Sequence, residues 1–273
     1  MRAFVAAGLF AAFLLAVTLW SEVLKSPSLE LAFLDVKQGD AIYVETPHGH
    51  QMLIDGGPDA TVLSRLGEVM PFYDKSIDLL VVTHPDADHI TGLVSVLESF
   101  EVQTVVWTGK ANDTRVFAAF AEALENEGAN LVLAEAGQEI VFGDSGAILE
   151  ILYPKEGIDI EGEASNETSI ISRLRYGGSS VLLPGDTTQK IERRLLKAGT
   201  DLKSDILKVA HHGSRTSSAP EFLLAVGPED AVISVGKGNR FGHPAQETLV
   251  NLAGYGMRIH RTDEEGTILF YLK

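Results

Sequence analysis

Apolar and polar residues alternate with two different periods along the chain. Short runs rich in Val, Ile and Leu, bounded by Gly, Pro, Asn or Asp, predict strands. These runs cover residues 29–36, 41–45, 51–54, 79–82, 102–107, 130–134, 139–142, 147–153, 170–176, 179–183, 205–210, 231–235, 258–261 and 267–272. Apolar residues spaced three and four apart predict helices over residues 61–70, 90–100, 113–127, 187–197 and 246–252. Strands and helices therefore interleave over most of the chain.

The first 25 residues have a different character. Residues 3–20 carry no charge and follow Arg2, and such a run of 18 residues is just long enough to cross a bilayer as a helix. No small-x-small cleavage site stands near Trp20, so an uncleaved membrane anchor is favoured over a removed signal. The rest of the chain would then lie outside the cytoplasm, although Lys25 argues against that orientation. If the segment were cleaved, the protein would be secreted.

Charge is distributed unevenly over the chain. The formal net charge is -16, which argues against a protein that coats nucleic acid without specificity. Residues 26–170 hold 26 acidic and 6 basic side chains, whereas residues 171–273 hold 11 acidic and 14 basic ones. The basic excess fits either ordinary solvated faces or a phosphate-binding surface, and both interpretations stay open. The chain has no cysteine, which excludes disulfides and thiolate-ligated zinc.

The most informative stretch is LLVVTHPDADHITGL. An apolar strand ends at His84, and Asp86, Asp88 and His89 follow within six residues. Pro85 cannot extend a strand ladder and disfavours helix at His84, so the shape of the loop is partly fixed. Imidazole and carboxylate ligands that converge from one short loop suit a pair of divalent ions. The alternative is a polar loop with scattered His and Asp, which fits this spacing poorly.

This spacing resembles the signature of the metallo-β-lactamase superfamily, H-x-H-x-D-H, with Asp86 in place of the second His. It is similar in particular to the hydrolase domain of ComEC-type DNA-internalisation proteins of bacterial competence, which carry H-x-D-x-D-H. The resemblance extends from Leu29 to the C-terminus. It implies an α/β fold, the four-layer αββα sandwich of the superfamily, over residues 26–273. One hydrophobic N-terminal helix with a linker, residues 1–25, would precede this hydrolase domain.

Two motifs near the start of the domain support the resemblance. DVKQGDAI and LIDGG are similar to the opening of ComEC-type domains, where DVGQGDA is typical, and Lys37 stands where that family has Gly. Asp55, in LIDGG, is expected to hold a ligand His by a hydrogen bond. A turn carboxylate without this role is the alternative. His48 and His50 lie at a hairpin and are expected to be exposed rather than ligands.

Asn166 and Ser169 belong to the motif NETS, at a point where many superfamily members supply a His. This chain has no His between His89 and His211. ComEC-type domains carry N-x-x-S here, and the resemblance implies that Asn166 and Ser169 bind substrate. Asn166 could orient a water or a phosphate, or act as a weak ligand. An Asn that merely starts a strand is equally compatible with the chemistry.

Two more strand ends supply candidate ligands. Asp186 follows the strand 179–183 and matches the superfamily's GD motif, so it is expected to bridge two metals. The strand 205–210 ends in HHGS. Alignment with the family's H-x-G makes His211 the expected metal ligand and leaves His212 free to contact substrate or protonate a leaving group. The reverse assignment of the two His stays open.

Ser214, Arg240 and His243 are expected to bind substrate. Ser214 belongs to HHGS, and Arg240 and His243 belong to NRFGHP, which is similar to the NRYGHP of the same family. Hydroxyl groups and a guanidinium suit phosphate oxygens.

The resemblance thus implies a site for two divalent ions, Mn²⁺ or Zn²⁺. The expected ligands are His84, Asp86, Asp88, His89, Asp186 and His211, and Asp88 and His212 are assigned to catalysis. One ion would take His84, Asp86 and Asp186, and the other would take Asp88, His89, Asp186 and His211. Three carboxylates shift the preference from Zn²⁺ toward Mn²⁺.

The expected activity is hydrolysis of a phosphodiester such as DNA by a metal-activated hydroxide. Two other classes stay open: a metallohydrolase of a small-molecule ester or lactam, and a non-catalytic membrane-anchored nucleic-acid binder. A single candidate span cannot form a channel, so a separate DNA-translocation channel is a candidate partner.

Overall fold

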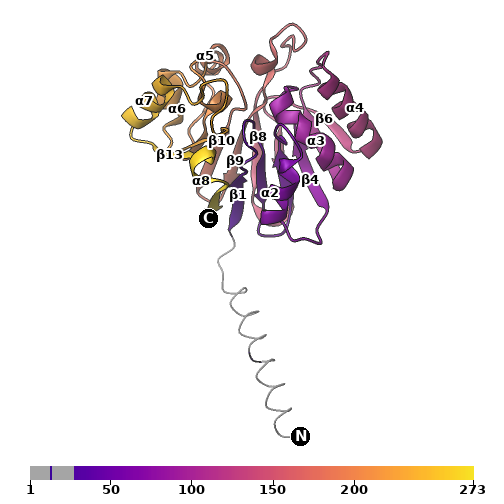
Figure 1. Ribbon diagram of the computed structural model, residues 1–273. Coiled ribbons are helices and arrows are strands. Elements are labelled where there is room, and N and C mark those ends of the chain that lie inside the picture. Colours follow the sequence, from indigo (N-terminus) through magenta and orange to yellow (C-terminus); the bar gives the residue numbers. More distant parts are fainter. Residues whose placement is uncertain (1–12, 14–27) are drawn as a thin grey trace, which may run out of the picture.

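The computed structural model describes Phe13 and residues 28–273. Apart from Phe13, the expected N-terminal helix therefore lies outside the described residues. Among the helices of the described part, none has the length and hydropathy needed to span a bilayer. From Leu29 onward the chain forms two sheets with helices on their outer faces (Figure 1).

The first sheet has seven strands in the order β14-β1-β2-β3-β4-β5-β6. Their bounds are β1 Leu29–Phe33, β2 Ile42–Glu45, β3 Gln51–Ile54, β4 Ser76–Val81, β5 Glu101–Trp107, β6 Asn130–Leu133 and β14 Ile268–Leu272. Strands β3 to β6 run parallel to one another, whereas the pairs β14–β1, β1–β2 and β2–β3 are antiparallel. Leu29 pairs with Leu272, so the start of β1 and the C-terminus lie at the same end of the sheet (Figure 1).

The second sheet also has seven strands, in the order β13-β12-β11-β10-β9-β8-β7. Their bounds are β7 Glu139–Val141, β8 Ile148–Tyr153, β9 Ile171–Tyr176, β10 Ser179–Leu183, β11 Ile206–Lys208, β12 Asp230–Ile233 and β13 Arg258–Arg261. Strands β10 to β13 run parallel. Each sheet thus has a parallel half, and the carboxyl ends of parallel strands are where α/β folds place their ligands.

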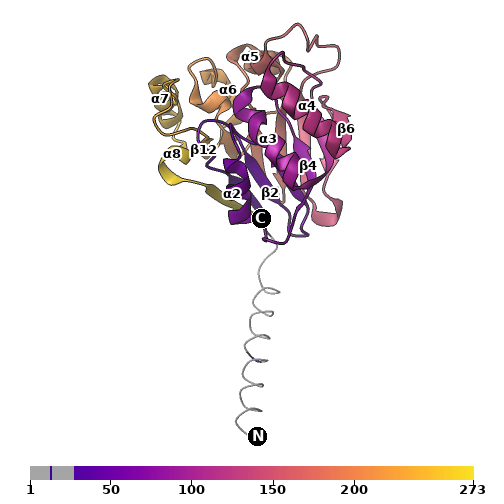
Figure 2. The same ribbon diagram turned by 45° about the vertical axis from the view of Figure 1, so that its right-hand side comes forward.

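Three apolar clusters hold the layers together. Between the sheets, Leu31 and Val81 of the first meet Leu149 and Leu183 of the second. On the outer face of the first sheet pack α2 Thr61–Val69, α3 Ala87–Ser99 and α4 Arg115–Glu127. The outer face of the second sheet is covered by α5 Gln189–Lys197, α6 Pro220–Val226 and α7 Gln246–Gly254. In Figure 1 the first three helices lie to the right and the last three to the left, and Figure 2 shows α2, α3 and α4 in front of the first sheet. The predicted four-layer αββα sandwich is confirmed.

The shorter elements are α8 Thr262–Glu265 and three 3-10 turns, η1 Gly143–Ser145, η2 Ser165–Thr168 and η3 Ala210–Gly213. Strands β3, β10 and β13 have the predicted bounds. Helix α3 begins at Ala87 rather than at residue 90, and β11 ends at Lys208 rather than at residue 210. Helix α6 was not predicted, because a helix of seven residues is too short to show the repeated three- and four-residue spacing of apolar residues by which helices are recognised.

Candidate metal centre

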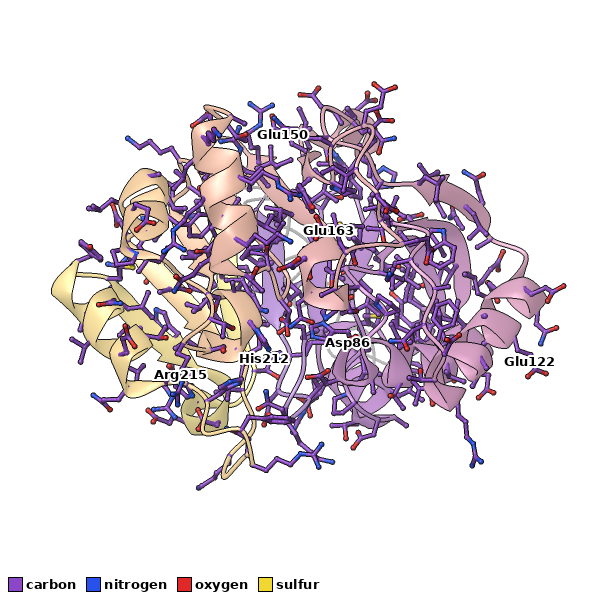
Figure 3. The ribbon with its side chains drawn as sticks, turned by 90° about the horizontal axis from the view of Figure 1, so that it is seen from above. Asp86, Glu122, Glu150, Glu163, His212 and Arg215 are labelled. Atoms are coloured by element: carbon purple, nitrogen blue, oxygen red, sulfur yellow. The ribbon has the colours of Figure 1, made fainter. Side chains whose placement is uncertain are left out.

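The candidate ligands lie at the carboxyl ends of strands from both sheets. β4 leads toward His84, β10 toward Asp186, and β11 toward His211 and His212. Parallel strands end at a common edge, so these side chains meet between the sheets. In Figure 3, Asp86 and His212 lie near the centre of the view, where the two halves join, and Glu122 lies at the periphery.

The motif that begins at His84 is half loop and half helix. His84 follows the strand, Asp86 is the N-cap residue of α3, and Asp88 and His89 lie in the first turn. Carboxylates near a helix N-terminus interact favourably with its dipole, which explains why α3 starts earlier than the apolar spacing predicts. His84 and His89 are buried as a result, with 1% and 0% of their surfaces exposed.

Asp55 fixes the orientation of two imidazoles. Its Oδ2 accepts hydrogen bonds from His89 Nδ1 at 2.8 Å and from the hydroxyl of Thr83 at 2.6 Å. The Thr83 oxygen lies 3.0 Å from His84 Nδ1. Because its own hydrogen points to Asp55, this oxygen accepts the Nδ1 hydrogen of His84. Both rings therefore use Nδ1 as a donor and direct Nε2 into the site.

His212 is oriented in the same way from the other half. Its Nδ1 lies 2.9 Å from the backbone oxygen of Ser234, which can only accept, so Nδ1 carries a hydrogen. Its Nε2 lies 3.2 Å from Asp186 Oδ2 and 3.4 Å from Asp88 Oδ2. His89 Nε2 lies 3.3 Å from the same oxygen of Asp186. Imidazoles from both halves thus converge on Asp186 Oδ2.

These donors fit divalent cations. The Nε2 atoms of His84, His89 and His212 are buried; that of His84 has no hydrogen-bond partner among the described residues, and those of His89 and His212 face carboxylate oxygens. Burying a polar atom without a partner costs free energy, and a metal ion would offset that cost. Two groups made up only of predicted site residues have their donor atoms within 4.8 Å of one another: His84, His89 and Asp186, and Asp88, His89 and His212.

The carboxylates of the cluster favour the protonated, positively charged form of two imidazoles. Burial opposes a charge on His212, but Asp186 foremost outweighs it and raises the pKa of His212 to about 9. Burial likewise opposes a charge on His89, yet Asp186 and Asp55 raise its pKa well above the usual value. Burial alone would raise the pKa of Asp186, but the imidazoles hold it well below its usual value. Without metal, protons take the place that cations would occupy.

The architecture and the donor set together agree with one protein family. A model of the metallo-beta-lactamase superfamily matches residues 34–237, which include every candidate ligand. The chain belongs to the metallo-beta-lactamase superfamily. It is a metallohydrolase of that superfamily, and the resemblance found in the sequence is confirmed.

Curated relatives of this metallohydrolase include competence proteins. ComE operon protein 3 of Bacillus subtilis (strain 168) is 32% identical over 266 residues, which cover 89% of this chain and 33% of the relative. Competence protein ComA of Neisseria gonorrhoeae is 32% identical over 243 residues, which cover 87% of this chain and 31% of the relative. The chain thus spans about a third of the length of these relatives.

Solved structures agree in fold. The metallo-beta-lactamase fold protein YhfI from Bacillus subtilis has a TM-score of 0.58 at 10% identity, covering 88% of this chain and 99% of that one. CmlA, a diiron β-hydroxylase from Streptomyces venezuelae, has a TM-score of 0.59 at 16% identity, covering 91% of this chain and 55% of that one. At these identities the likeness shows the fold alone.

Asp86, which replaces the second His of the superfamily signature, lies at the margin of the cluster. Its Oδ2 is 3.7 Å from His84 Nε2, and its side chain is 34% exposed. Its Oδ1 accepts a hydrogen bond from the Ser165 hydroxyl at 2.6 Å. Asp86 is therefore placed beside His84, as the motif predicts, with one oxygen engaged by η2.

His211 lies at the rim rather than inside the cluster. Its Nε2 is 3.9 Å from Asp186 Oδ2, and its side chain is 24% exposed. Asn166 Nδ2 lies 3.4 Å from both nitrogens of the His211 ring. Burial lowers the pKa of His211. Of the two neighbouring His, the structure thus directs His212 into the metallohydrolase centre, whereas the sequence alignment favoured His211 as a ligand.

The backbone of η3 separates these two rings. His211, His212 and Gly213 all have left-handed conformations, with φ of 50°, 53° and 78°. A Cβ atom on Gly213 would lie 2.7 Å from Pro244 Cβ, so only glycine fits there. Side chains held in such conformations cluster at functional sites, and here they turn the two imidazole planes 73° apart.

The predicted substrate-binding residues fall into two groups. Ser169 and Ser214 are buried; the Ser169 hydroxyl accepts a hydrogen bond from the backbone N–H of Asp186 at 3.2 Å. His243 lies at the rim, with its ring centroid 5.6 Å from that of His211. Arg240 is exposed, and its guanidinium lies 5.0 Å from the Phe241 ring. The two serines are placed to support the site, and the other two to border it.

Sequence reasoning missed three residues beside the ligands: Thr83, Asp40 and Lys208. Asp40 is brought close by Gly39, where a Cβ atom would overlap the backbone oxygen of Asp88. Its motif, DVKQGDAI, was recognised without a role for this carboxylate. Lys208 could also have been recognised from the sequence, because it is a charged residue at the end of an apolar run that predicts a buried strand.

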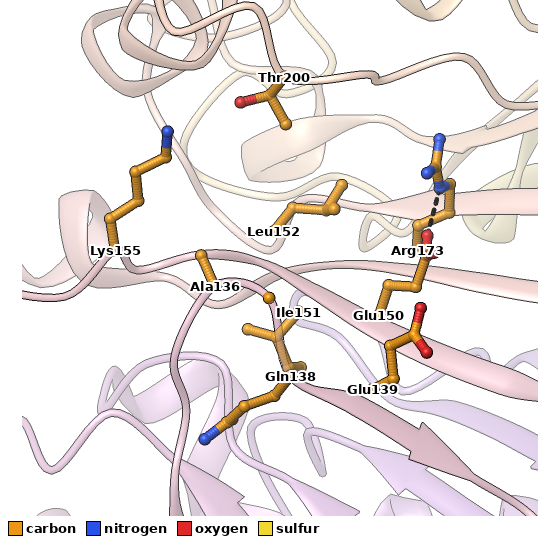
Figure 4. A pocket seen from close by; sticks show the side chains of 10 residues that line it. Ala136, Gln138, Glu139, Glu150, Ile151, Leu152, Lys155, Arg173 and Thr200 are labelled. Atoms are coloured by element: carbon orange, nitrogen blue, oxygen red, sulfur yellow. Dashed lines mark hydrogen bonds and ion pairs between the residues drawn. The ribbon is translucent and has the colours of Figure 1, made fainter.

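A surface hollow of about 350 Å³ lies elsewhere, lined by residues of β7, β8 and β9 among others (Figure 4). It shares no lining residue with the metal centre. Its main charges neutralise one another, since Arg173 Nε lies 2.7 Å from Glu150 Oε2. The hollow therefore offers no ligand set comparable to that around Asp186.

Proposed function

We propose that this metallohydrolase cleaves phosphodiester bonds with two divalent ions, Mn²⁺ or Zn²⁺, and that DNA is its substrate. The observation that carries the proposal is the convergence of three buried imidazole nitrogens, Nε2 of His84, His89 and His212, on the Asp186 carboxylate. The competence relatives support a substrate connected with DNA.

Each ion would have its own ligands. His84 and Asp86 would hold one ion, Asp88, His89 and His212 would hold the other, and Asp186 would serve both. When bound, a divalent pair supplies a nucleophile at neutral pH and offsets negative charge on the phosphate. Three carboxylates among these ligands favour Mn²⁺ over Zn²⁺.

The chain's own residues would position the substrate. His211 would take the role that the sequence alignment gave to His212, contact with a phosphate oxygen or a leaving group, because its side chain is 24% exposed at the rim of the cluster. Asn166 orients the His211 ring. The Asp88 side chain is 33% exposed, and its Oδ2 lies 3.4 Å from the buried Nε2 of His212. Asp88 therefore joins the buried cluster to the solvent-exposed side of the site, and we keep its predicted catalytic role.

The membrane anchor and the extracytoplasmic location remain proposals as well. The uncharged run of residues 3–20 supports them. The greater length of the competence relatives supports a separate DNA-translocation channel as a partner. Fractionation of cells that express the full chain tests the anchor: recovery in the membrane fraction is expected, and recovery in the soluble fraction would contradict it.

The activity is tested with the full chain stripped of metal. Mn²⁺, Zn²⁺ or Mg²⁺ is added separately, and single-stranded DNA, double-stranded DNA, RNA and a chromogenic phosphodiester are offered with a lactam and a carboxylic ester. Metal-dependent cleavage of phosphodiesters, with Mn²⁺ the best ion, is expected. Cleavage of only the ester or the lactam would contradict the proposal.

A further inference from the structure

A buried lysine lies against the candidate ligands. Lys208, the last residue of β11, is 1% exposed. Its ammonium pairs with the carboxylate of Asp40, lies 3.4 Å from Asp186 Oδ1, and donates to the backbone oxygen of Gly185 at 3.2 Å. Burying an ion pair requires desolvation of both charges, so a lysine here is not explained by stability alone.

The two oxygens of Asp186 face different partners. Oδ1 faces the ammonium of Lys208, whereas Oδ2 faces the Nε2 atoms of His89 and His212 at 3.3 and 3.2 Å. A carboxylate can bind cations through either oxygen. Lys208 therefore leaves only one oxygen of Asp186 turned toward the imidazoles.

Asp40 would otherwise offer a further cation pocket. Its carboxylate is 2% exposed, and Oδ1 forms no hydrogen bond with any described residue. Asp40, Asp186 and His212 have donor atoms within 4.8 Å of one another, as the expected metal ligands do. The ammonium of Lys208 contacts both carboxylates of this group.

We propose that Lys208 is a positioning residue whose ammonium fills the pocket between Asp40 and Asp186, and so confines metal ions to the Oδ2 side of Asp186. The inference rests on the proposed metal site.

Equilibrium dialysis of the metal-stripped full chain against Co²⁺ tests the proposal. Lys208→Met keeps the length of the side chain and removes its charge, so it is expected to bind one Co²⁺ ion more than the wild type, with a changed visible absorption spectrum. The double variant Lys208→Met/Asp40→Asn is expected to return to the wild-type count, because the added pocket loses a carboxylate. A wild-type count and spectrum for Lys208→Met would overturn the proposal.

A second measurement does not depend on the folding of a variant. In a crystal structure of the wild type loaded with Mn²⁺, anomalous peaks are expected beside Oδ2 of Asp186, with Lys208 Nζ still on Oδ1. A peak between Asp40 and Asp186, or a Lys208 side chain turned away, would overturn the proposal. Neither experiment reads turnover, so a protein that binds metal as expected and cleaves no phosphodiester would contradict only the proposed function.

Discussion

Asp55→Asn offers a sharp test of how the metal centre is organised. In the wild type, Oδ1 of Asp55 accepts the backbone N–H of Thr83 at 2.9 Å, and Oδ2 accepts from His89 Nδ1 and the Thr83 hydroxyl. An amide can keep the first bond. Its NH₂ group replaces Oδ2, however, and can only donate. His89 Nδ1 must then accept, so the ring hydrogen moves to Nε2 and faces the metal site.

The change reaches a second ligand. Once the Thr83 hydroxyl has lost its acceptor, it can donate to His84 Nδ1 at 3.0 Å, which also reverses that ring. Loss of a partner that orients one ligand typically lowers metal affinity about 10–100-fold. Because two ligands are affected, we expect a loss near the upper value, which is about 2.7 kcal/mol of binding free energy.

The measurement is a competition titration of Mn²⁺ or Zn²⁺ against a chromophoric chelator, with ¹⁵N shifts of the imidazoles as a direct report on the protonated nitrogen. Asp78→Asn is the matched control. Asp78 also accepts a backbone N–H, that of Gln51 at 2.8 Å, but its contacts lie outside the metal centre. A folded Asp55→Asn protein with wild-type metal affinity would refute the reasoning.

The remaining predictions concern the ligands and the scaffold. His212→Ala is expected to lower metal affinity by at least 10-fold, whereas His211→Ala should lower turnover with little loss of metal, as measured by metal content and activity together; equal losses of metal would contradict the assignment. Because the pKa of His212 is raised to about 9, protons compete with metal, so metal affinity should rise from pH 7 to about 9 in calorimetric titrations, with proton release. The same shift means that the metal-free protein loses stability as pH rises through that interval, and a flat profile would argue against it. Glu192 accepts from the backbone N–H groups of Ser218 and Ala219 at 2.6 and 2.8 Å, so Glu192→Ala should lower the free energy of unfolding by about 2–4 kcal/mol in a urea titration without changing metal affinity.

Most of the fold follows from local patterns in the sequence. The strands that deliver ligands are short apolar runs, and β3 and β10 have the bounds that these runs predict. The early start of α3 could not be predicted from apolar spacing, because it depends on carboxylates near the helix N-terminus. Pairing of β14 with β1 joins residues more than 230 positions apart, which no local pattern reports.

The site was predicted less completely than the fold. The spacing of His84, Asp86, Asp88 and His89 carries its own signal, since all come from one strand end. The choice between His211 and His212 depends on three successive residues with left-handed backbone conformations. The spacing of residues in the sequence does not predict these conformations. Lys208 and Asp40 meet only because β11 and the turn before β2 come together in space. The roles of the predicted site residues remain predictions until the variants are measured.

The most direct measurement compares phosphodiester cleavage with bound metal in the full chain and in Asp186→Asn. Asp113→Asn, an exposed carboxylate outside the centre, is the control. We expect Mn²⁺-dependent cleavage by the wild type and by the control, and loss of both bound metal and cleavage in Asp186→Asn. Wild-type cleavage by Asp186→Asn, or metal binding by the wild type without cleavage of any phosphodiester, would contradict the account.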